Sequence, residues 1–172
     1  IVCPGGGFSY VGAIHEGFPL AIALSRMGYN AFSIQYRTGG AQVACEDLAQ
    51  AINFIMRHAE ELQVSTEDYS LWGGSAGARM AAYLGSYSTQ GFIDATHERP
   101  AAVIMGYTGH SEYTQNDPPT YVIIGEDDAI ANPATMRRRV ENLQALGIDA
   151  EFHLLPDLRH GFGLGIGATA EG

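Results

Sequence analysis

A serine flanked by glycines, in the stretch 73–77 (Gly-Gly-Ser-Ala-Gly), constrains this chain more than any other feature. Residues 68–72 before it have strand character, and residues 78–84 after it favour a helix. A turn between them forces Ser75 into a strained backbone conformation, so its flanking positions must lack bulky side chains. The pattern predicts a nucleophile at the tip of a strand-turn-helix unit. An ordinary glycine-rich turn has the same residues, so the rest of the chain must decide.

Strand-like and helix-like segments alternate along the chain. Strands are expected at residues 1–3, 30–36, 68–72, 101–106, 120–125 and 150–155, and helices at 14–27, 48–62, 78–84 and 133–146. Short connections and right-handed crossovers then give an α/β fold, a three-layer sandwich whose mostly parallel sheet has helices on both faces. We expect one domain, 1–172.

Composition argues against several other classes of protein. Apolar residues make up 46% of the chain and charged residues 16%, as in globular rather than disordered proteins. The net charge of −10 opposes binding to nucleic acid or to an anionic membrane, and the basic run 137–139 is interpreted as a solvated helix face. No apolar run approaches the roughly 20 residues of a membrane span. Localisation is little constrained, with a cytoplasmic one favoured.

Functional groups in parallel sheets gather at the carboxyl ends of the strands. This rule selects the 5–7 loop, Ser75, the 106–107 turn, Asp128 and the loop around His160. A serine hydroxyl is a weak nucleophile, so it needs a base within hydrogen-bond reach and a third group that orients the base. The chain supplies candidates for these roles in the order Ser, Asp, His.

His160 is the best candidate for the base among the six histidines. It lies in a loop directly after the last strand, where Gly161 allows a sharp turn. His110 also follows a strand end and remains a competitor. The other four lie on a helix, within a strand or beside the wrong elements: His15, His58, His97 and His153.

Asp128 is the best candidate for the orienting carboxylate, because only it and Asp127 follow a buried strand. It lies three residues past Gly125, deep enough in the loop to reach the histidine. Asp127 is the alternative, and it could instead cap the next helix. The remaining candidates have ordinary turn or surface explanations: Asp94, Asp117, Asp149 and Asp157.

The glycines at 5–7 leave backbone N–H groups uncovered after the first strand. The amides of Gly6 and Gly7, with that of Ala76 at the start of the next helix, are candidates to bind the oxyanion of an acyl-transfer reaction. Glycine loops after strands also bind phosphates. Spacing argues against that alternative, because the loop is neither Gly-x-Gly-x-x-Gly nor a loop ending in Gly-Lys-Ser/Thr.

Taken together, the chain resembles the α/β-hydrolase superfamily, and most closely its small esterase and lipase-like branch with a Gly-Gly-Gly oxyanion loop. The resemblance rests on the stretches 4–8, 73–77, 119–128 and 160–163. It implies that Ser75 is the nucleophile, His160 the general base and Asp128 its orienting partner. The oxyanion donors would be the amides of Gly6, Gly7 and Ala76.

The sequence departs from that branch in three places. The early strands that normally precede the glycine loop are missing and only twelve residues follow His160, so either the sheet is short or the domain is incomplete at its N-terminus. Pro4 stands where many relatives have His before the glycines, and the segment between Tyr107 and Pro119 is too short for a lid domain. We therefore expect a minimal cap and an open site.

The implied activity is that of a serine hydrolase, a carboxylesterase or acetylesterase that cleaves short-acyl esters through an acyl-serine intermediate. The substrate would be a small-molecule or carbohydrate-borne ester. A serine peptidase of the same fold and a noncatalytic ligand-binding protein are the alternatives. This reaction needs no metal or organic cofactor, and none is expected. Cys3 and Cys45 have neither the spacing of a zinc site nor that of a disulfide framework.

Overall fold

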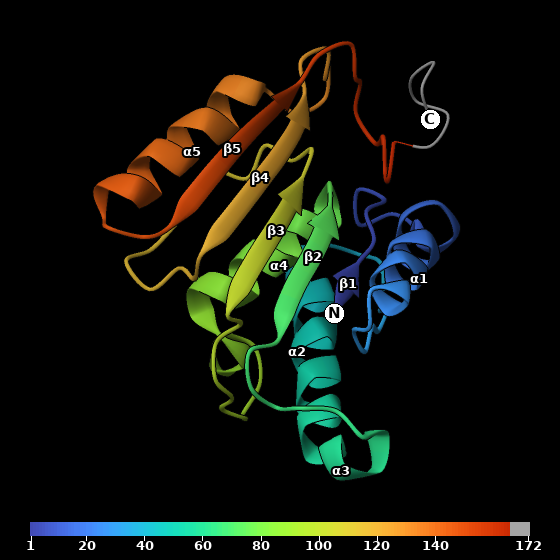
Figure 1. The fold of residues 1–172 in the computed structure, drawn as a ribbon. Helices are drawn as coiled ribbons and strands as arrows, with labels where there is room; N and C mark the ends of the chain where they lie inside the picture. The colour runs from blue at the N-terminus through green and yellow to red at the C-terminus, as the bar shows by residue number, and fades with distance from the viewer. Residues whose placement is uncertain (166–172) are drawn as a thin grey trace.

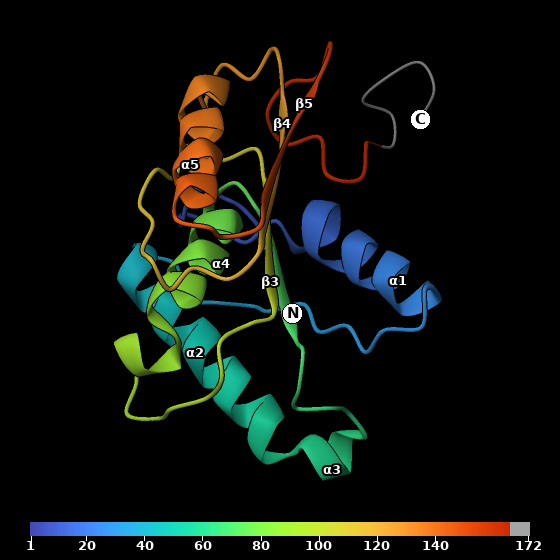
Figure 2. The ribbon, with the colours of Figure 1, turned by 60° about the vertical axis from the view of Figure 1, so that its left-hand side comes forward.

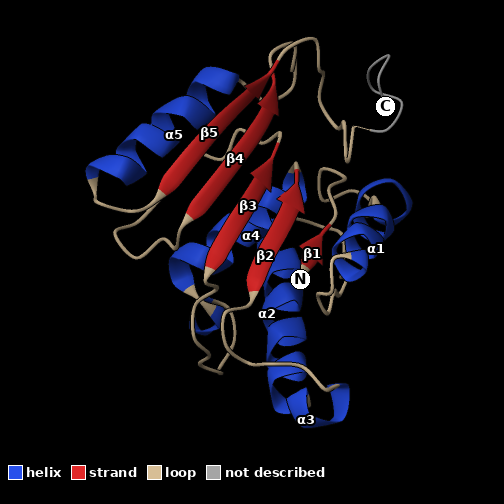
Figure 3. Cartoon of the chain, in the orientation of Figure 1, coloured by secondary structure: helices blue, strands red, loops and turns tan. Residues whose placement is uncertain are grey.

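A parallel sheet forms the middle of the molecule, with its strands in the order β1-β2-β3-β4-β5 (Figures 1 and 3). The computed structural model describes residues 1–165, so the glycine-rich end of the predicted domain lies outside the described residues. The strands are β1 (Val2–Cys3), β2 (Ser70–Gly74), β3 (Ala102–Gly106), β4 (Thr120–Gly125) and β5 (Ala150–Leu155). They confirm five of the six predicted strands.

The register of the sheet aligns the carboxyl ends of its strands. Gly74 of β2 pairs with Gly106 of β3, and Gly125 of β4 pairs with Leu155 of β5. The chain therefore leaves these strands at one edge of the sheet, and segments far apart in the sequence meet there.

Helices cover both faces of the sheet (Figure 2). On one face lie α2 (Ala41–Arg57), α4 (Ala76–Tyr87) and α5 (Pro133–Ala145), and on the other lies α1 (Phe18–Arg26). A π turn (Ala13–Gly17) precedes α1, and the shorter elements are α3 (Ala59–Leu62) and a 3-10 turn (Thr89–Gly91). This arrangement is the predicted three-layer sandwich. None of the described helices is both long and apolar enough to cross a membrane.

The main core lies between the sheet and the face that carries α2, α4 and α5. Apolar residues recur along α2 at helical spacing and turn one stripe of that helix towards α4 and the sheet. Burying each such side chain stabilises the fold by about 1.5–3 kcal/mol. Side chains at most 1% exposed include Leu48, Ile52, Leu71, Met80, Leu84, Met105 and Ile124.

The predicted strand at 30–36 is wrong in its extent. This segment meets the sheet at one bridge, between Ser33 and Val2, flanked by backbone hydrogen bonds of 2.7 and 3.0 Å. Its neighbour β1 has only two residues, so a longer ladder has no partner. The alternating pattern instead directs Ile34 and Tyr36 into the core.

The helix predicted over 48–62 begins earlier, at Ala41, and is interrupted at His58. The backbone of His58 leaves the helical region, with φ −110° and ψ 20°, while its Nδ1 lies 2.8 Å from the carbonyl oxygen of Phe54. The amide of His58 still donates to the carbonyl oxygen of Phe54 at 3.0 Å, so the change in backbone angles at His58 is what divides α2 from α3.

The interpretation of residues 137–139 as a solvated face is wrong for its last member. Arg139 is 2% exposed, and its Nη2 donates to Oδ2 of Asp117 at 2.6 Å. Asp117, expected at the surface or in an ordinary turn, is 7% exposed. Arg137 lies over the ring of Phe152, with 4.4 Å between its Cζ and the ring centroid.

Candidate active site

Ser75 lies in the turn between β2 and α4, as predicted. Its backbone has φ 52° and ψ −115°, a conformation that residues with a Cβ rarely adopt. Its N–H donates to the carbonyl oxygen of Gly106 on β3 at 2.9 Å, which holds the turn against the neighbouring strand. The side chain therefore stands at the carboxyl edge of the sheet, at the start of α4.

The glycines around Ser75 are required by close backbone approaches. A Cβ on Gly73 would overlap the backbone of Gly77 and Ala78, and a Cβ on Gly77 would overlap the carbonyl of Cys3 in β1. The turn can be this sharp only because these positions have no side chains.

His160 and Asp128 meet Ser75 at this edge. His160 Nε2 lies 2.9 Å from Ser75 Oγ, and His160 Nδ1 lies 2.8 Å from Asp128 Oδ2 and 3.0 Å from Oδ1. The side chain of Asp128 is fully buried, and that of His160 is 16% exposed. The amides of Ile130 and Ala131 also donate to Asp128 Oδ1, at 2.9 and 2.7 Å. A carboxylate held by these donors keeps the proton of a neutral imidazole on Nδ1, which leaves Nε2 free to accept from the serine.

The competing candidates lie elsewhere. Asp127 is exposed, and its amide donates to the carbonyl oxygen of Leu158 at 3.0 Å. His110 is 4% exposed and packs edge-on against Tyr83, with ring centroids 4.6 Å apart. Burial, with the charge of Arg139 adding to it, lowers the pKa of His110 to about 4. A buried, uncharged His110 therefore belongs to the packing against Tyr83 of α4.

The glycine loop lies against the serine turn. A Cβ on Gly5 would lie 3.0 Å from Ser75 Cβ, and the hydroxyl of Tyr36 donates to the carbonyl oxygen of Pro4 at 2.8 Å. Gly6 and Gly7 have φ of 134° and 61°, which favour glycine. In the described part of this loop, the amides of Gly6 and Gly7 donate to no protein acceptor, and the amide of Ala76 opens α4, where an N–H has no partner within the helix.

Two further residues at this edge were not assigned roles from the sequence. Tyr107 follows β3 at the strand end that the carboxyl-edge rule already selects, and its ring meets that of His160 edge-on at 5.3 Å. Glu16 accepts from the amide of Gly5 at 2.6 Å. It lies in the π turn before α1, where no strand end or motif marks it.

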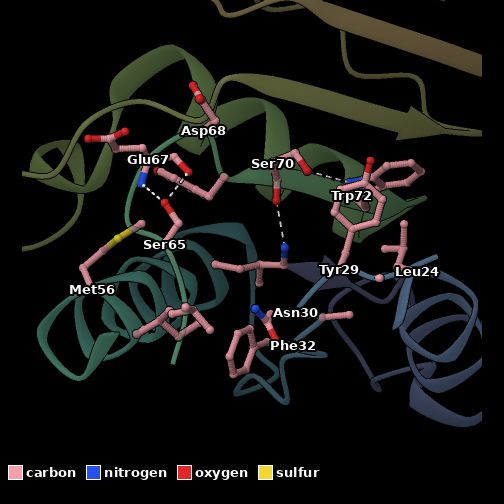
Figure 4. Close-up of a pocket in the computed structure, with 16 residues that line it drawn as sticks. Leu24, Tyr29, Asn30, Phe32, Met56, Ser65, Glu67, Asp68, Ser70 and Trp72 are labelled. Atoms are coloured by element: carbon pink, nitrogen blue, oxygen red, sulfur yellow. Dashed lines mark hydrogen bonds between the residues drawn. The ribbon is translucent and has the colours of Figure 1, made fainter. Parts of the chain in front are cut away.

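A cavity of about 440 Å³ lies at the opposite, amino ends of β1 and β2, and Figure 4 shows the residues that line it. Tyr29, Trp72, Glu67 and Asp68 help to line it, and the backbone nitrogen of Ile1 donates there to the carbonyl oxygen of Ser70 at 2.7 Å. No histidine or cysteine lines this cavity. The described residues also contain no cluster of three His, Cys, Asp or Glu side chains able to hold a metal ion. The groups suited to acyl transfer therefore gather at the carboxyl edge.

Solved structures share this fold. An alpha/beta hydrolase enzyme from a Medee basin deep-sea metagenome library superposes with a TM-score of 0.82 at 27% identity, over 95% of this chain and 70% of that one. An acetyl ester-xyloside bifunctional hydrolase from Caldicellulosiruptor lactoaceticus gives 0.87 at 21% identity, over 99% and 76%. A carboxylesterase from Lactobacillus plantarum WCFS1 gives 0.82 at 24% identity, over 95% and 72%.

The sequence is also similar to that of a curated protein. An acetylxylan esterase of Xylanibacter ruminicola is 22% identical over 193 aligned residues, which include 94% of this chain. The chain spans 40% of the length of that relative. The sequence pattern of the BD-FAE family matches residues 1–108, which is more than half of the chain. By this match and by its fold, the chain belongs to the BD-FAE family of the α/β-hydrolase superfamily.

Proposed function

We propose that this protein is a serine esterase that hydrolyses carboxylic esters through an acyl intermediate on Ser75. The observation that carries the proposal is the hydrogen-bonded series Ser75–His160–Asp128, with separations of 2.9 and 2.8 Å. Three side chains from separate loops meet there in the order that acyl transfer requires.

The first half of the reaction follows from this arrangement. His160 Nε2 takes the proton of Ser75 Oγ while Oγ forms a bond to the carbonyl carbon of the ester. The carbonyl oxygen becomes an oxyanion. The amides of Gly6 and Gly7 in the Gly-Gly-Gly oxyanion loop would stabilise it, together with the amide of Ala76 at the start of α4. When the carbon–oxygen bond breaks, His160 returns its proton to the leaving alcohol and the acyl group remains on the serine.

Water completes the cycle. His160 removes a proton from a water molecule as the water oxygen attacks the acyl carbon, and it then protonates Ser75 Oγ as the carboxylic acid leaves. Asp128 accepts from Nδ1–H throughout and stabilises the imidazolium that forms in each half. No step requires a metal or an organic cofactor.

We propose acetyl groups on a carbohydrate as the substrate class. Two proteins support this, because an acetylxylan esterase is similar to this chain in sequence and an acetyl ester-xyloside hydrolase shares its fold. The segment between Tyr107 and Pro119 also leaves little chain for a cap, which suits a short acyl group on a bulky alcohol.

Hydrolysis of p-nitrophenyl esters by the wild type and by Ser75→Ala tests the esterase proposal. The wild type should turn over acetate faster than longer acyl chains, and the variant should lose about 10⁴-fold or more in kcat. Equal rates for the two proteins would refute the proposed nucleophile. Faster turnover of long chains would contradict the short-acyl proposal, and cleavage of peptide amides without esters would indicate a peptidase.

A further inference from the structure

Glu16 lies directly behind the glycine loop. Its Oε2 accepts from the amide of Gly5 at 2.6 Å, and Gly5 is the buried residue that precedes Gly6 and Gly7. The acceptor thus fixes the orientation of the peptide unit that leads into the proposed oxyanion loop. The loop is also tied to the π turn by the amide of Gly12, which donates to the carbonyl oxygen of Gly5 at 2.8 Å.

Tyr107 lies behind the histidine loop. It is 4% exposed, and its φ of 34° is unusual for a residue with a side chain. Its ring meets His160 at 5.3 Å and Phe162 at 4.7 Å, edge-on in both cases. Burial raises the pKa of Tyr107, and the charge of Glu16 raises it further. The phenol therefore stays protonated and can donate.

The two oxygens converge on one point beside the nucleophile. A Cβ built on Gly74 would lie 2.5 Å from the Tyr107 hydroxyl and 2.6 Å from Glu16 Oε2. A Cβ built on Gly5 would lie 2.9 Å from the same carboxylate oxygen. The residue before Ser75 is therefore glycine for a specific reason, since these polar atoms occupy the space of its side chain.

We propose that Glu16 and Tyr107 are positioning residues that act as one unit, the Glu16–Tyr107 brace, which holds the oxyanion loop and the histidine loop in place around Ser75. In kinetic terms the inference rests on the proposed esterase function. In structural terms it concerns only how two loops are held against the serine turn.

The expected effect is on kcat rather than on KM. Oxyanion donors act only when placed at the oxygen of the transition state, and losing one typically lowers kcat by about 10²- to 10³-fold. The brace acts through the two loops that it holds, so its loss should displace these donors more than it weakens substrate binding. A displacement of about 1 Å can lower the rate by about 10²-fold.

Kinetics of four variants on p-nitrophenyl acetate test the brace. Glu16→Ala should lower kcat by about 10- to 100-fold with KM changed by less than about threefold. Glu16→Gln keeps an oxygen acceptor for the Gly5 amide and should recover most of the loss. Tyr107→Phe keeps the ring packing and should lower kcat by about three- to tenfold. The double variant Glu16→Ala/Tyr107→Phe should be no slower than Glu16→Ala, because residues in one unit are not additive.

Thr89→Val is the matched control. Thr89 Oγ1 accepts from the amide of His97 at 3.2 Å and donates to the carbonyl oxygen of Ala95 at 2.8 Å, and it lies beyond the far end of α4. This variant also removes a side-chain acceptor from a backbone amide, so it should lower the melting temperature while leaving kcat unchanged. If Glu16→Gln is as slow as Glu16→Ala, or if the two single losses multiply in the double variant, the brace is refuted.

Hydrogen exchange provides a readout that needs no activity. Glu16→Ala should speed amide exchange in peptides that cover residues 5–10 and 158–163, whereas Thr89→Val should speed it only around residues 89–97. If the wild type proves inactive on esters but this pattern holds, the proposed function fails and the brace stands. If exchange in both loops is unchanged, the brace is refuted whatever the rates show.

Discussion

Two buried aspartates of this fold have similar surroundings and different consequences. Asp128 is fully buried and Asp117 has a side chain 1% exposed, and each accepts several hydrogen bonds. Asp117 faces Arg139, whose Nη2 lies 2.6 Å away and which is itself 1% exposed. Asp128 faces His160, which is partly exposed and has its second nitrogen 2.9 Å from Ser75 Oγ.

The difference lies in the partner of each carboxylate. Arg139 carries a permanent charge and is enclosed, so its pair with Asp117 can only hold α5 to the segment before β4. The imidazole of His160 gains and loses a proton under mild conditions and reaches solvent on one side. A carboxylate buried beside a fixed cation thus supports structure, whereas one buried beside a reachable imidazole can support proton transfer.

Among the carboxylate variants, Asp128→Asn should have the largest effect on activity. The amide would donate to His160 Nδ1 and favour the tautomer that carries its proton on Nε2, so the serine would lose its base. We expect kcat for p-nitrophenyl acetate to fall by about 10⁴-fold, measured at a pH near neutrality. The melting temperature should change little, because Asn still accepts from the amides of Ile130 and Ala131.

The matched control for that variant is Asp127→Asn. Asp127 is adjacent in sequence but exposed, and its backbone rather than its side chain holds the loop to Leu158. We expect a change in kcat of less than about threefold. A large loss in Asp127→Asn with little in Asp128→Asn would reverse the assignment of the two carboxylates.

Asp117→Asn should have the largest effect on stability. It leaves the guanidinium of Arg139 buried without its countercharge, and breaking such a pair typically costs about 3–5 kcal/mol. Urea unfolding should show this decrease, while kcat per folded molecule should match the wild type. Asp47→Asn, which breaks a pair with the exposed Arg37, should cost much less, because solvent screens that pair. If the two variants lost equal free energy of unfolding, burial would not be what makes the Asp117–Arg139 pair important for stability.

His110→Phe should have a smaller effect, seen only in acid. The pKa of His110 is lowered to about 4, first by burial and then by the charges of Arg139 and Arg79. Between this value and about 6.5, the usual pKa, the unfolded chain binds a proton that the folded protein does not. The stability that the neutral His110 contributes is therefore fully present above about pH 6.5. It decreases as the pH drops through this range and stops decreasing below about pH 4.

Phe keeps the edge-on contact with Tyr83 and cannot be protonated, so this variant should lose less stability than the wild type on acidification. The expected difference is about 2.5 kcal/mol between pH 7 and about pH 4.5, measured by urea unfolding at both values. Thr89→Val, which removes no titratable group, should keep the slope of the wild type. If His110→Phe loses as much unfolding free energy on acidification as the wild type, this histidine does not cause the loss of stability in acid.

Much of this fold was predictable because it depends on local patterns. The strands at 101–106, 120–125 and 150–155 have strong β-formers bounded by Pro and Gly, and the structure confirms them. The glycines at 73–77 also made the tight turn predictable, because such a turn needs flanking residues without bulky side chains. The proposed site follows from the same logic, since strand ends of a parallel sheet share one edge.

The misjudged residues depend on tertiary contacts. Nothing in the run 137–139 distinguishes the arginine that is buried, because its burial depends on Asp117 from another loop. Glu16 is similarly unmarked, since its acceptor role exists only once the π turn lies against the glycine loop. The sequence correctly predicted an extended segment at 30–36. How many of its residues pair in the sheet depends on the length of the neighbouring strand β1, which the segment itself does not reveal.

The close approach of Gly77 to the carbonyl of Cys3 affects how damage to this turn should be interpreted. A scan of substitutions would find positions 73 and 77 as intolerant as position 75, although neither glycine takes part in chemistry. A replacement of Gly77 would force α4 away from β1, and a replacement of Gly73 would force it away from β2, so the polypeptide should accumulate poorly in cells. Replacement of the serine should instead yield abundant, well-folded and inert protein. Only abundance measured beside activity separates these two kinds of failure.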